Sequence, residues 1–203
     1  MIALVDYGAG NLTSVRKALT HLDAGFFTPE TAGQCRGTRG LIVPGVGHFD
    51  ATSALGPDWH AAVRESVQAG VPLLGICVGM QWLFEGSDEA PAVPGLGVLE
   101  GRIARLEGDA NRRLKVPHVG WNALQIRGAP RLLSGLTSGA EVYFTHSYGA
   151  PVTPACAAST THVNTFASVV ERDNVFGVQF HPEKSGEVGL TILRNFLAAC
   201  GGC

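Results

Sequence analysis

The sequence predicts an α/β fold in which a mixed, mostly parallel central sheet is flanked by helices. In the first half, short apolar runs alternate with segments of helical periodicity, an order typical of a parallel sheet covered on both faces. Glycine accounts for 27 of the 203 residues, which indicates many tight turns between strands and helices. We expect one domain over residues 1–203, because about 100–200 residues is a common domain size.

The first half contains three candidate buried strands, each followed by a loop and a helical segment. The expected strands lie at 2–5, 40–43 and 71–76, and the expected helices at 11–22, 58–69 and 78–85. Asn11 is a suitable N-cap for the first helix, and Gly70 is placed to end the second as its C′ residue. This half therefore predicts the parallel part of the sheet.

The second half predicts shorter strands, some of them antiparallel. Its apolar segments are rich in Val, Phe, Tyr and Trp and are separated by turn residues. They lie near 98–106, 114–126, 141–148, 165–171 and 175–180. A helix over 189–200 with an apolar stripe follows them.

Composition and charge exclude several classes of protein. Apolar residues make up 45% and charged residues 16%, which excludes a disordered chain. A formal net charge of -2 gives no basic field for a nucleic-acid backbone, so we expect no nucleic-acid partner. Residues 1–6 lack the basic start of a signal peptide, and no apolar run reaches the ~18 residues of a membrane span. With five widely spaced cysteines, we expect a cytoplasmic protein without disulfides or membrane contact.

A candidate nucleophile, Cys77, stands where the third strand meets a helix. Gly75 and Gly79 flank it in the Gly-x-nucleophile-x-Gly pattern of a nucleophile elbow, where glycines avoid collisions in a strained turn. The sulfur would point into a cleft at the carboxyl end of the sheet, beside a helix N-terminus that favours thiolate. The amide of Val78 is a candidate oxyanion donor. The alternative is a buried structural cysteine between packing glycines.

A candidate base follows the last apolar strand. His181 and Glu183 flank Pro182, which biases His181 toward extended geometry. In an extended segment, residues i and i+2 project to the same side, so the carboxylate can bond one imidazole nitrogen and leave the other for a thiol. An exposed polar loop is the alternative interpretation of this segment taken alone.

The third element is Pro-Gly-Val-Gly at 44–47, which leaves the second strand. Its two glycines allow the backbone to present N–H groups or to rotate a peptide. Taken alone, a tight turn is the simpler interpretation.

Together these segments resemble the class I (triad) glutamine amidotransferases. Residues 44–47 are similar to the oxyanion strand of that family, 75–81 (Gly-Ile-Cys-Val-Gly-Met-Gln) to its nucleophile elbow, and 179–183 (Gln-Phe-His-Pro-Glu) to its base motif. Within the family, four segments resemble the glutaminase subunits of imidazole glycerol phosphate synthase. They are 44–49, 116–122 (Val-Pro-His-Val-Gly-Trp-Asn), 143–148 and 181–185 (His-Pro-Glu-Lys-Ser).

The resemblance implies a flavodoxin-like amidotransferase fold and a glutaminase reaction. Cys77 would attack the side-chain carboxamide of glutamine, and His181, held by Glu183, would carry the protons. A γ-glutamyl thioester would form, ammonia would leave, and water would release glutamate. The implied partner is a (β/α)8-barrel cyclase in a heterodimer. The barrel takes up the ammonia and makes imidazole glycerol phosphate and aminoimidazole carboxamide ribotide in histidine biosynthesis, so the synthase has hydrolase and lyase activities. No metal or organic cofactor is implied.

The resemblance also assigns positions in the glutamine pocket and at the partner surface. Backbone groups of Gly45, Val46 and Gly47 would contribute to the oxyanion hole. The glutamine-binding side chains would be Gln81, Glu89, His146, Ser147 and Tyr148. The positions at or near the cyclase-facing surface would be Asn11, His118, Trp121, Tyr143 and Lys184. Plainer roles stay open for several of these: a helix cap for Asn11, core packing for Trp121 and Tyr143, and a solvated charge for Lys184.

Some residues depart from the family pattern. Val78 and Trp82 stand where Leu is more usual, and Thr145 where Val is expected. The tail Cys200-Gly201-Gly202-Cys203 is not a family feature, and a lone pair of cysteines falls short of the four ligands that zinc normally takes. We therefore expect no metal site there.

Two other functions stay open at this point. One is the glutaminase of another ammonia-using synthase, such as pyridoxal phosphate synthase, which segment 116–122 argues against. The other is a non-catalytic flavodoxin-like binding protein, which would not need Cys77, His181, Glu183 and Gln81 together. For a glutaminase, we also expect segment 44–47 to keep the oxyanion hole unformed until the partner binds its substrate, so the isolated chain should be slow.

Overall fold

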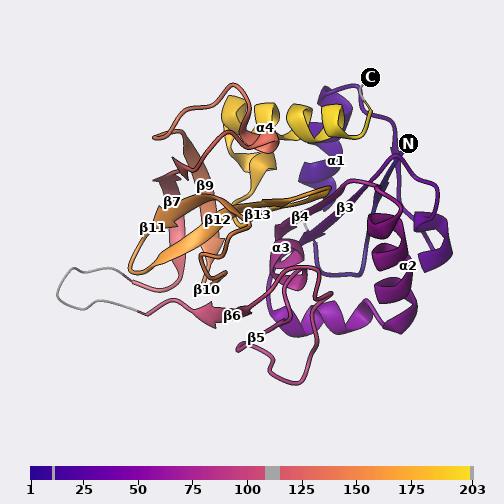
Figure 1. Cartoon of the computed structure of the whole chain (residues 1–203), viewed down its shortest axis with the longest axis horizontal. Coiled ribbons are helices and arrows are strands. Elements are labelled where there is room, and N and C mark those ends of the chain that lie inside the picture. The colour runs from indigo at the N-terminus through magenta and orange to yellow at the C-terminus, as the bar shows by residue number, and fades with distance from the viewer. Residues whose placement is uncertain (11, 108–114, 202–203) are drawn as a thin grey trace.

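The computed structural model describes residues 1–10, 12–107 and 115–201 (Figure 1). In this part of the chain, the largest sheet has eight strands in the order β2-β1-β3-β4-β13-β12-β11-β8. Its strands are β1 (Ile2–Leu4), β2 (Phe26–Phe27), β3 (Gly40–Gly45), β4 (Leu73–Cys77), β8 (Gln125–Ile126), β11 (Cys156–Thr161), β12 (Thr165–Arg172) and β13 (Val175–Val178). The pairs from β2 to β13 are parallel, and those from β13 to β8 are antiparallel.

Two smaller sheets carry the remaining strands of the described residues. One has the order β10-β6-β5, and the other is the antiparallel pair β7-β9. Their strands are β5 (Gly86–Ser87), β6 (Arg102–Arg105), β7 (His118–Ala123), β9 (Glu141–His146) and β10 (Tyr148–Gly149).

Helices cover both faces of the main sheet. They are α1 (Leu12–His21), α2 (Pro57–Gln68), α3 (Val78–Trp82) and α4 (Gly186–Ala199), with 3₁₀ turns at Ala32–Cys35, Phe49–Ala54, Arg131–Leu133 and Pro182–Lys184. Residues of α1 and α4 pack in one hydrophobic cluster and residues of α2 in the other, while α3 contributes to both. Figure 1 shows α1 and α4 together on one side of the sheet and α2 on the opposite side.

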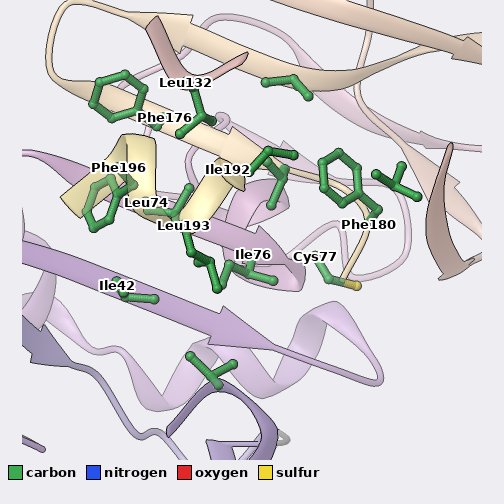
Figure 2. Packing of buried hydrophobic residues seen from close by; sticks show 14 of the residues in the cluster. Ile42, Leu74, Ile76, Cys77, Leu132, Phe176, Phe180, Ile192, Leu193 and Phe196 are labelled. Atoms are coloured by element: carbon green, nitrogen blue, oxygen red, sulfur yellow. The ribbon is translucent and has the colours of Figure 1, made fainter. Parts of the chain in front are cut away.

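The core between α4 and the sheet is built from alternate strand residues and an apolar helix stripe. Ile192, Leu193 and Phe196 of α4 lie over Leu74 and Phe176 of neighbouring strands (Figure 2). Burial of this kind stabilises a fold by about 25 cal/mol per Å² of apolar surface. The cluster reaches Cys77, so the nucleophile candidate sits at the end of a well-packed strand.

The structure confirms the predicted α/β class and corrects several boundaries. The helix expected over 78–85 ends at Trp82, because residues 83–85 form turns that bond to the 95–101 segment. The strand expected at 98–106 shortens to β6, and 114–126 divides into β7 and β8 in its described part. The sequence prediction missed β2, β5 and β11.

No helix in the described ranges is long and apolar enough to cross a membrane. Within those same ranges, no three His, Cys, Asp or Glu side chains gather in a way that could hold a metal ion.

Candidate active site

Cys77 lies at a sharp junction between β4 and α3. Its backbone has φ 54° and ψ -111°, a positive φ that is strained for a residue with a side chain. A methyl group on Gly79 would collide with the carbonyl oxygen of Val43, and one on Gly75 with the backbone at Gly79. The helix can therefore start this close to the sheet only with glycine at both positions. This is the geometry of a nucleophile elbow.

His181 and Glu183 form a buried pair beside the elbow. His181 Nδ1 lies 2.9 Å from Glu183 Oε1, and each side chain is only 2% exposed. His181 itself is extended, with φ -101° and ψ 97°, as expected. Pro182–Lys184 is a 3₁₀ turn, however, so the expectation that a fully extended segment brings the two residues together was wrong. The tight turn brings Glu183 back onto the ring instead. The predicted contact exists, with a different backbone geometry.

Neighbouring segments fix the backbone of His181 in place. The amide of His181 donates to the carbonyl of Tyr143 on β9 at 3.0 Å. The Ser185 hydroxyl donates to the His181 carbonyl at 2.7 Å and accepts from the Tyr143 amide at 3.0 Å. Burial alone would lower the pKa of His181, but its interactions with Cys77 and Glu183 outweigh burial and raise it to about 9. The neighbouring carboxylate and sulfur thus favour the imidazolium, while its Nε2 has no hydrogen-bond partner among the described residues.

The triad candidates open onto a cavity of about 260 Å³ at the carboxyl end of the central strands. It is lined by Val46, Gly47, Cys77, Val78, Gln81, Glu89, Pro117, Thr145, His146, Ser147, Tyr148 and His181. A cavity of this size suits a small amino acid more than a drug-sized ligand. Of the predicted pocket residues, Gly45 does not line it and packs instead under Tyr7 and Val78. Pro117 and Thr145 line it without having been assigned a pocket role from the sequence.

Gln81 and Glu89 are held rigidly at the cavity wall. Gln81 Nε2 donates to the Tyr148 carbonyl at 3.0 Å and to Gln179 Oε1 at 3.1 Å. Glu89 Oε2 accepts from the Phe49 amide at 2.8 Å. Gln179 was not singled out from the sequence as a site residue, although it stands two residues before His181. Its Nε2 lies 3.7 Å from Cys77 Sγ, so it contacts the sulfur directly.

A chain of hydrogen bonds runs from the cavity wall through two imidazoles. His146 Nδ1 lies 2.8 Å from the Tyr148 carbonyl, His146 Nε2 lies 3.0 Å from His118 Nδ1, and His118 Nε2 lies 3.3 Å from Asn122 Nδ2. The carbonyl can only accept, and Asn122 Nδ2 can only donate. When both rings are neutral, each donor in this series faces an acceptor: Asn122 donates to His118, His118 to His146, and His146 to the Tyr148 carbonyl. Burial, together with the neighbouring imidazoles, lowers the pKa of His118 to about 3 and that of His146 to about 4.

Val46, the middle of the oxyanion segment, is engaged elsewhere in this conformation. Its amide donates to the carbonyl of Ala9 at 2.7 Å, in the loop that follows β1. That N–H is therefore not available to an oxyanion beside Cys77. The first amides of α3, by contrast, have no acceptor within the helix.

The predicted partner-surface residues divide into two groups. His118 was expected at or near that surface, but its side chain, at the start of β7, is buried (3% exposed) and stacked on Phe144 and His162. Trp121 is 55% exposed and meets Tyr143 edge-to-face at 6.1 Å, while Lys184 Nζ lies 5.9 Å from the Tyr143 ring centre. Asn11 lies outside the described residues, as does Cys203 of the tail. Cys200 is a free, buried thiol.

Comparisons with known proteins agree with this geometry. The family model for class-I glutamine amidotransferases matches residues 3–200. The HisH subunit of imidazole glycerol phosphate synthase from Deinococcus radiodurans is 45% identical, over 96% of this chain and 92% of that protein. The HisH subunit from Thermococcus kodakarensis is 43% identical, over 97% of this chain and 98% of that protein.

Solved structures agree at the level of the fold. A crystal structure of a glutamine amidotransferase superposes with a TM-score of 0.76 at 22% identity, covering 98% of each chain. The glutaminase domain of a Trypanosoma brucei CTPS with bound acivicin superposes with a TM-score of 0.68 at 18% identity, covering 100% of this chain and 94% of that one. The chain therefore belongs to the class-I glutamine amidotransferase family and, within it, to the glutaminase subunits of imidazole glycerol phosphate synthase.

Proposed function

We propose that this chain hydrolyses glutamine through a Cys77–His181–Glu183 triad and delivers the ammonia to a cyclase subunit in histidine biosynthesis. One observation carries the proposal. The strained elbow holds Cys77 beside a buried imidazole whose other nitrogen is bonded to a carboxylate. That arrangement of nucleophile, base and orienting group is the requirement for covalent acyl transfer.

The reaction follows from the protonation states that the site favours. The raised pKa of His181 supports an imidazolium that can donate a proton, and the proposed starting state pairs it with the Cys77 thiolate. The Cys77 thiolate attacks the carboxamide carbon of glutamine, and the imidazolium gives its proton to the departing amine, so that ammonia leaves and a γ-glutamyl thioester remains. Neutral His181 then takes a proton from water, the hydroxide attacks the thioester, and the thiolate leaves with glutamate as product. Water and glutamine are consumed, and glutamate and ammonia are made.

We assign glutamine binding to side chains of the cavity wall. The proposed contacts are Gln81 and Glu89 for the amino and carboxylate ends of the substrate, with His146, Ser147 and Tyr148 closing the pocket. All five line the same cavity as Cys77, which supports the assignment. The proposal needs no metal or organic cofactor, and it takes residues 1–203 as one amidotransferase domain.

The oxyanion hole is proposed to form only in the activated complex. Val78 would supply one donor and Val46 the second, with Gly45 and Gly47 allowing the backbone to move. The bond from the Val46 amide to the Ala9 carbonyl supports this gating, because it holds that donor away from the nucleophile. Loss of one oxyanion donor typically costs ~10²–10³ in rate. The isolated chain should accordingly be a poor glutaminase.

The proposed partner is a (β/α)8-barrel cyclase in a heterodimer. It would carry the lyase activity of the synthase and convert a ribulosyl formimino nucleotide to imidazole glycerol phosphate and aminoimidazole carboxamide ribotide. Support comes from the HisH relatives, which are named as synthase subunits, and from an exposed face on this chain. Trp121 and Val119 of β7 are 55% and 56% exposed, and Tyr143 and Lys184 lie beside Trp121. Exposed aromatic residues of this kind are common at interfaces.

Glutamate release tests the proposal in three mixtures: the chain alone, the chain with the barrel subunit, and the same complex with the nucleotide substrate. We expect strong activity only in the third mixture and none with Cys77→Ala. Strong activity in the chain alone would keep the triad and contradict the gating. Absence of activity in every mixture would contradict the proposed reaction and partner.

A further inference from the structure

Tyr7 is a partly buried residue for which the proposed reaction has no role. It lies in the loop between β1 and α1, and its hydroxyl oxygen is shielded from solvent. None of the residues that the structure describes gives this oxygen a hydrogen-bond partner. A buried, unpaired hydroxyl is unfavourable, so Tyr7 would gain from any state of the protein that brings an acceptor next to it.

The hydroxyl sits against the oxyanion segment. A methyl group on Gly45 would collide with Tyr7 Oη, so the hydroxyl occupies the space where a side chain of residue 45 would be. Gly45 is the last residue of β3 and stands in register with Cys77. Burial raises the pKa of Tyr7 and the nearby Cys77 raises it further, so Tyr7 keeps its proton and acts as a donor.

The same loop also holds the oxyanion segment in its present conformation. Ala9, two residues after Tyr7, accepts the hydrogen bond from the Val46 amide at 2.7 Å. The peptide between Gly45 and Val46 is planar, and its N–H and C=O point in opposite directions. Since the N–H points toward Ala9, the Gly45 carbonyl points away from that loop.

Rotation of this peptide would exchange the two groups. The Val46 amide would leave Ala9 and turn toward the cavity, while the Gly45 carbonyl would turn toward the loop that carries Tyr7. We infer that the Tyr7 hydroxyl then donates to the Gly45 carbonyl, which makes Tyr7 a positioning residue for the active oxyanion strand. One hydrogen bond to the loop replaces another, and the buried hydroxyl gains its partner. The inference rests on the proposed function, in which this rotation completes the oxyanion hole.

Tyr7→Phe tests the inference because it keeps the ring and removes the hydroxyl alone. In the complex with the barrel subunit and its nucleotide, we expect kcat for glutamate release to fall about fivefold, with KM for glutamine unchanged. Fivefold corresponds to one net hydrogen bond of about 1 kcal/mol, at 1.4 kcal/mol for each factor of ten. Because the hydroxyl is unpaired in the resting chain, the melting temperature of the free variant should be unchanged or higher.

Thr153→Val is the matched control. Thr153 Oγ1 is also buried and unpartnered among the described residues, and Thr153 does not line the active cavity. Its removal should change the melting temperature as little as Tyr7→Phe does and leave the activated kcat at the wild-type value. The pH profile of Cys77 alkylation by iodoacetamide should be the same in wild type and Tyr7→Phe, because the hydroxyl acts on the strand and not on the sulfur.

Each outcome bears on the inference. An unchanged activated kcat in Tyr7→Phe would overturn it, as would a loss of folding, since an unpaired hydroxyl is not needed to fold. A rise in KM or a shifted alkylation profile would place Tyr7 on the substrate or the thiolate instead. If wild type releases no glutamate in the full complex, the proposed function fails and the inference fails with it. A slow Tyr7→Phe complex beside an active wild type and control would support it.

Discussion

Mild acid should destabilise this protein through the imidazoles of His118 and His146. Both rings must be neutral for the hydrogen bonds from Asn122 to the Tyr148 carbonyl to keep a single direction. A proton added to either ring would set two N–H groups against each other in a buried space. The pKa of His118 is lowered to about 3 and that of His146 to about 4, mainly by burial.

The direction and size of this loss of stability follow from the difference in proton binding between the folded and unfolded protein. Both folded pKa values lie below the ordinary value of 6.5, so stability that is present above pH 6.5 is lost as the pH falls toward 4. At pH 5, His146 should cost about 2 kcal/mol, and His118 about 1 kcal/mol because partly exposed His162 stacks on it and admits solvent screening. His181 acts in the opposite direction. Its raised pKa gives stability that is full below pH 6.5 and is lost toward pH 9, a gain of about 1 kcal/mol between pH 7 and 5.

The net loss of about 2 kcal/mol between pH 7 and pH 5 can be measured by urea unfolding at the two values. His118→Asn keeps an amide donor near His146 and cannot titrate, so its loss should be about half that of wild type. His21→Asn, at an exposed position at the end of α1, serves as the control and should lose as much as wild type. Equal losses in wild type and His118→Asn, or no loss in wild type, would refute the reasoning.

Three substitutions test other parts of the site. Glu183→Gln should lower the activated kcat by ~10³–10⁴ with little change in KM, because the imidazole loses its orienting charge; steady-state kinetics that show less than a tenfold loss would contradict this. Gly79→Ala should destabilise by about 2–3 kcal/mol in urea unfolding, because the new methyl meets a carbonyl of β3, whereas Gly25→Ala has room and serves as its control. Trp121→Ala should change stability by less than about 0.5 kcal/mol and weaken binding of the barrel subunit at least ~10-fold by calorimetry, while the similarly exposed Val152→Ala should bind normally.

The parallel half of the sheet could be predicted because its strands are continuous apolar runs between glycine turns. β11 could not, since Cys156–Thr161 consists of small residues with no hydrophobic alternation. It is buried because β12 and β8 pair with it on either side; β12 follows it in a short hairpin, whereas β8 lies more than 30 residues earlier in the chain. β2 and β5 have two residues each, which leaves no pattern to detect.

Contacts in the candidate site could be anticipated from motif spacing, but their geometry could not. His181 and Glu183 meet through a 3₁₀ turn, a local conformation that the proline alone does not determine. The orientation of β7 could not be predicted from the sequence either. Its polar residue His118 faces inward, while Val119 and Trp121 face out. A strand with apolar side chains in the core and polar side chains outside would have the reverse orientation. The observed orientation depends on hydrogen bonds that join His118 to His146 and Asn122, which the tertiary fold brings together.

The peptide that we propose to rotate lies where the sheet ends. β3 is paired with β4 up to Gly45, opposite Cys77, whereas its pairing with β1 ends at Ile42. The peptide after Gly45 is therefore the first one past the paired strand, and the Val46 amide is held by Ala9 of a loop. It can rotate without disturbing the strand that positions the nucleophile. The proposed nucleophile and the proposed switchable oxyanion donor can thus be neighbours, because hydrogen bonds between strands fix the first and a loop that also carries Tyr7 holds the second.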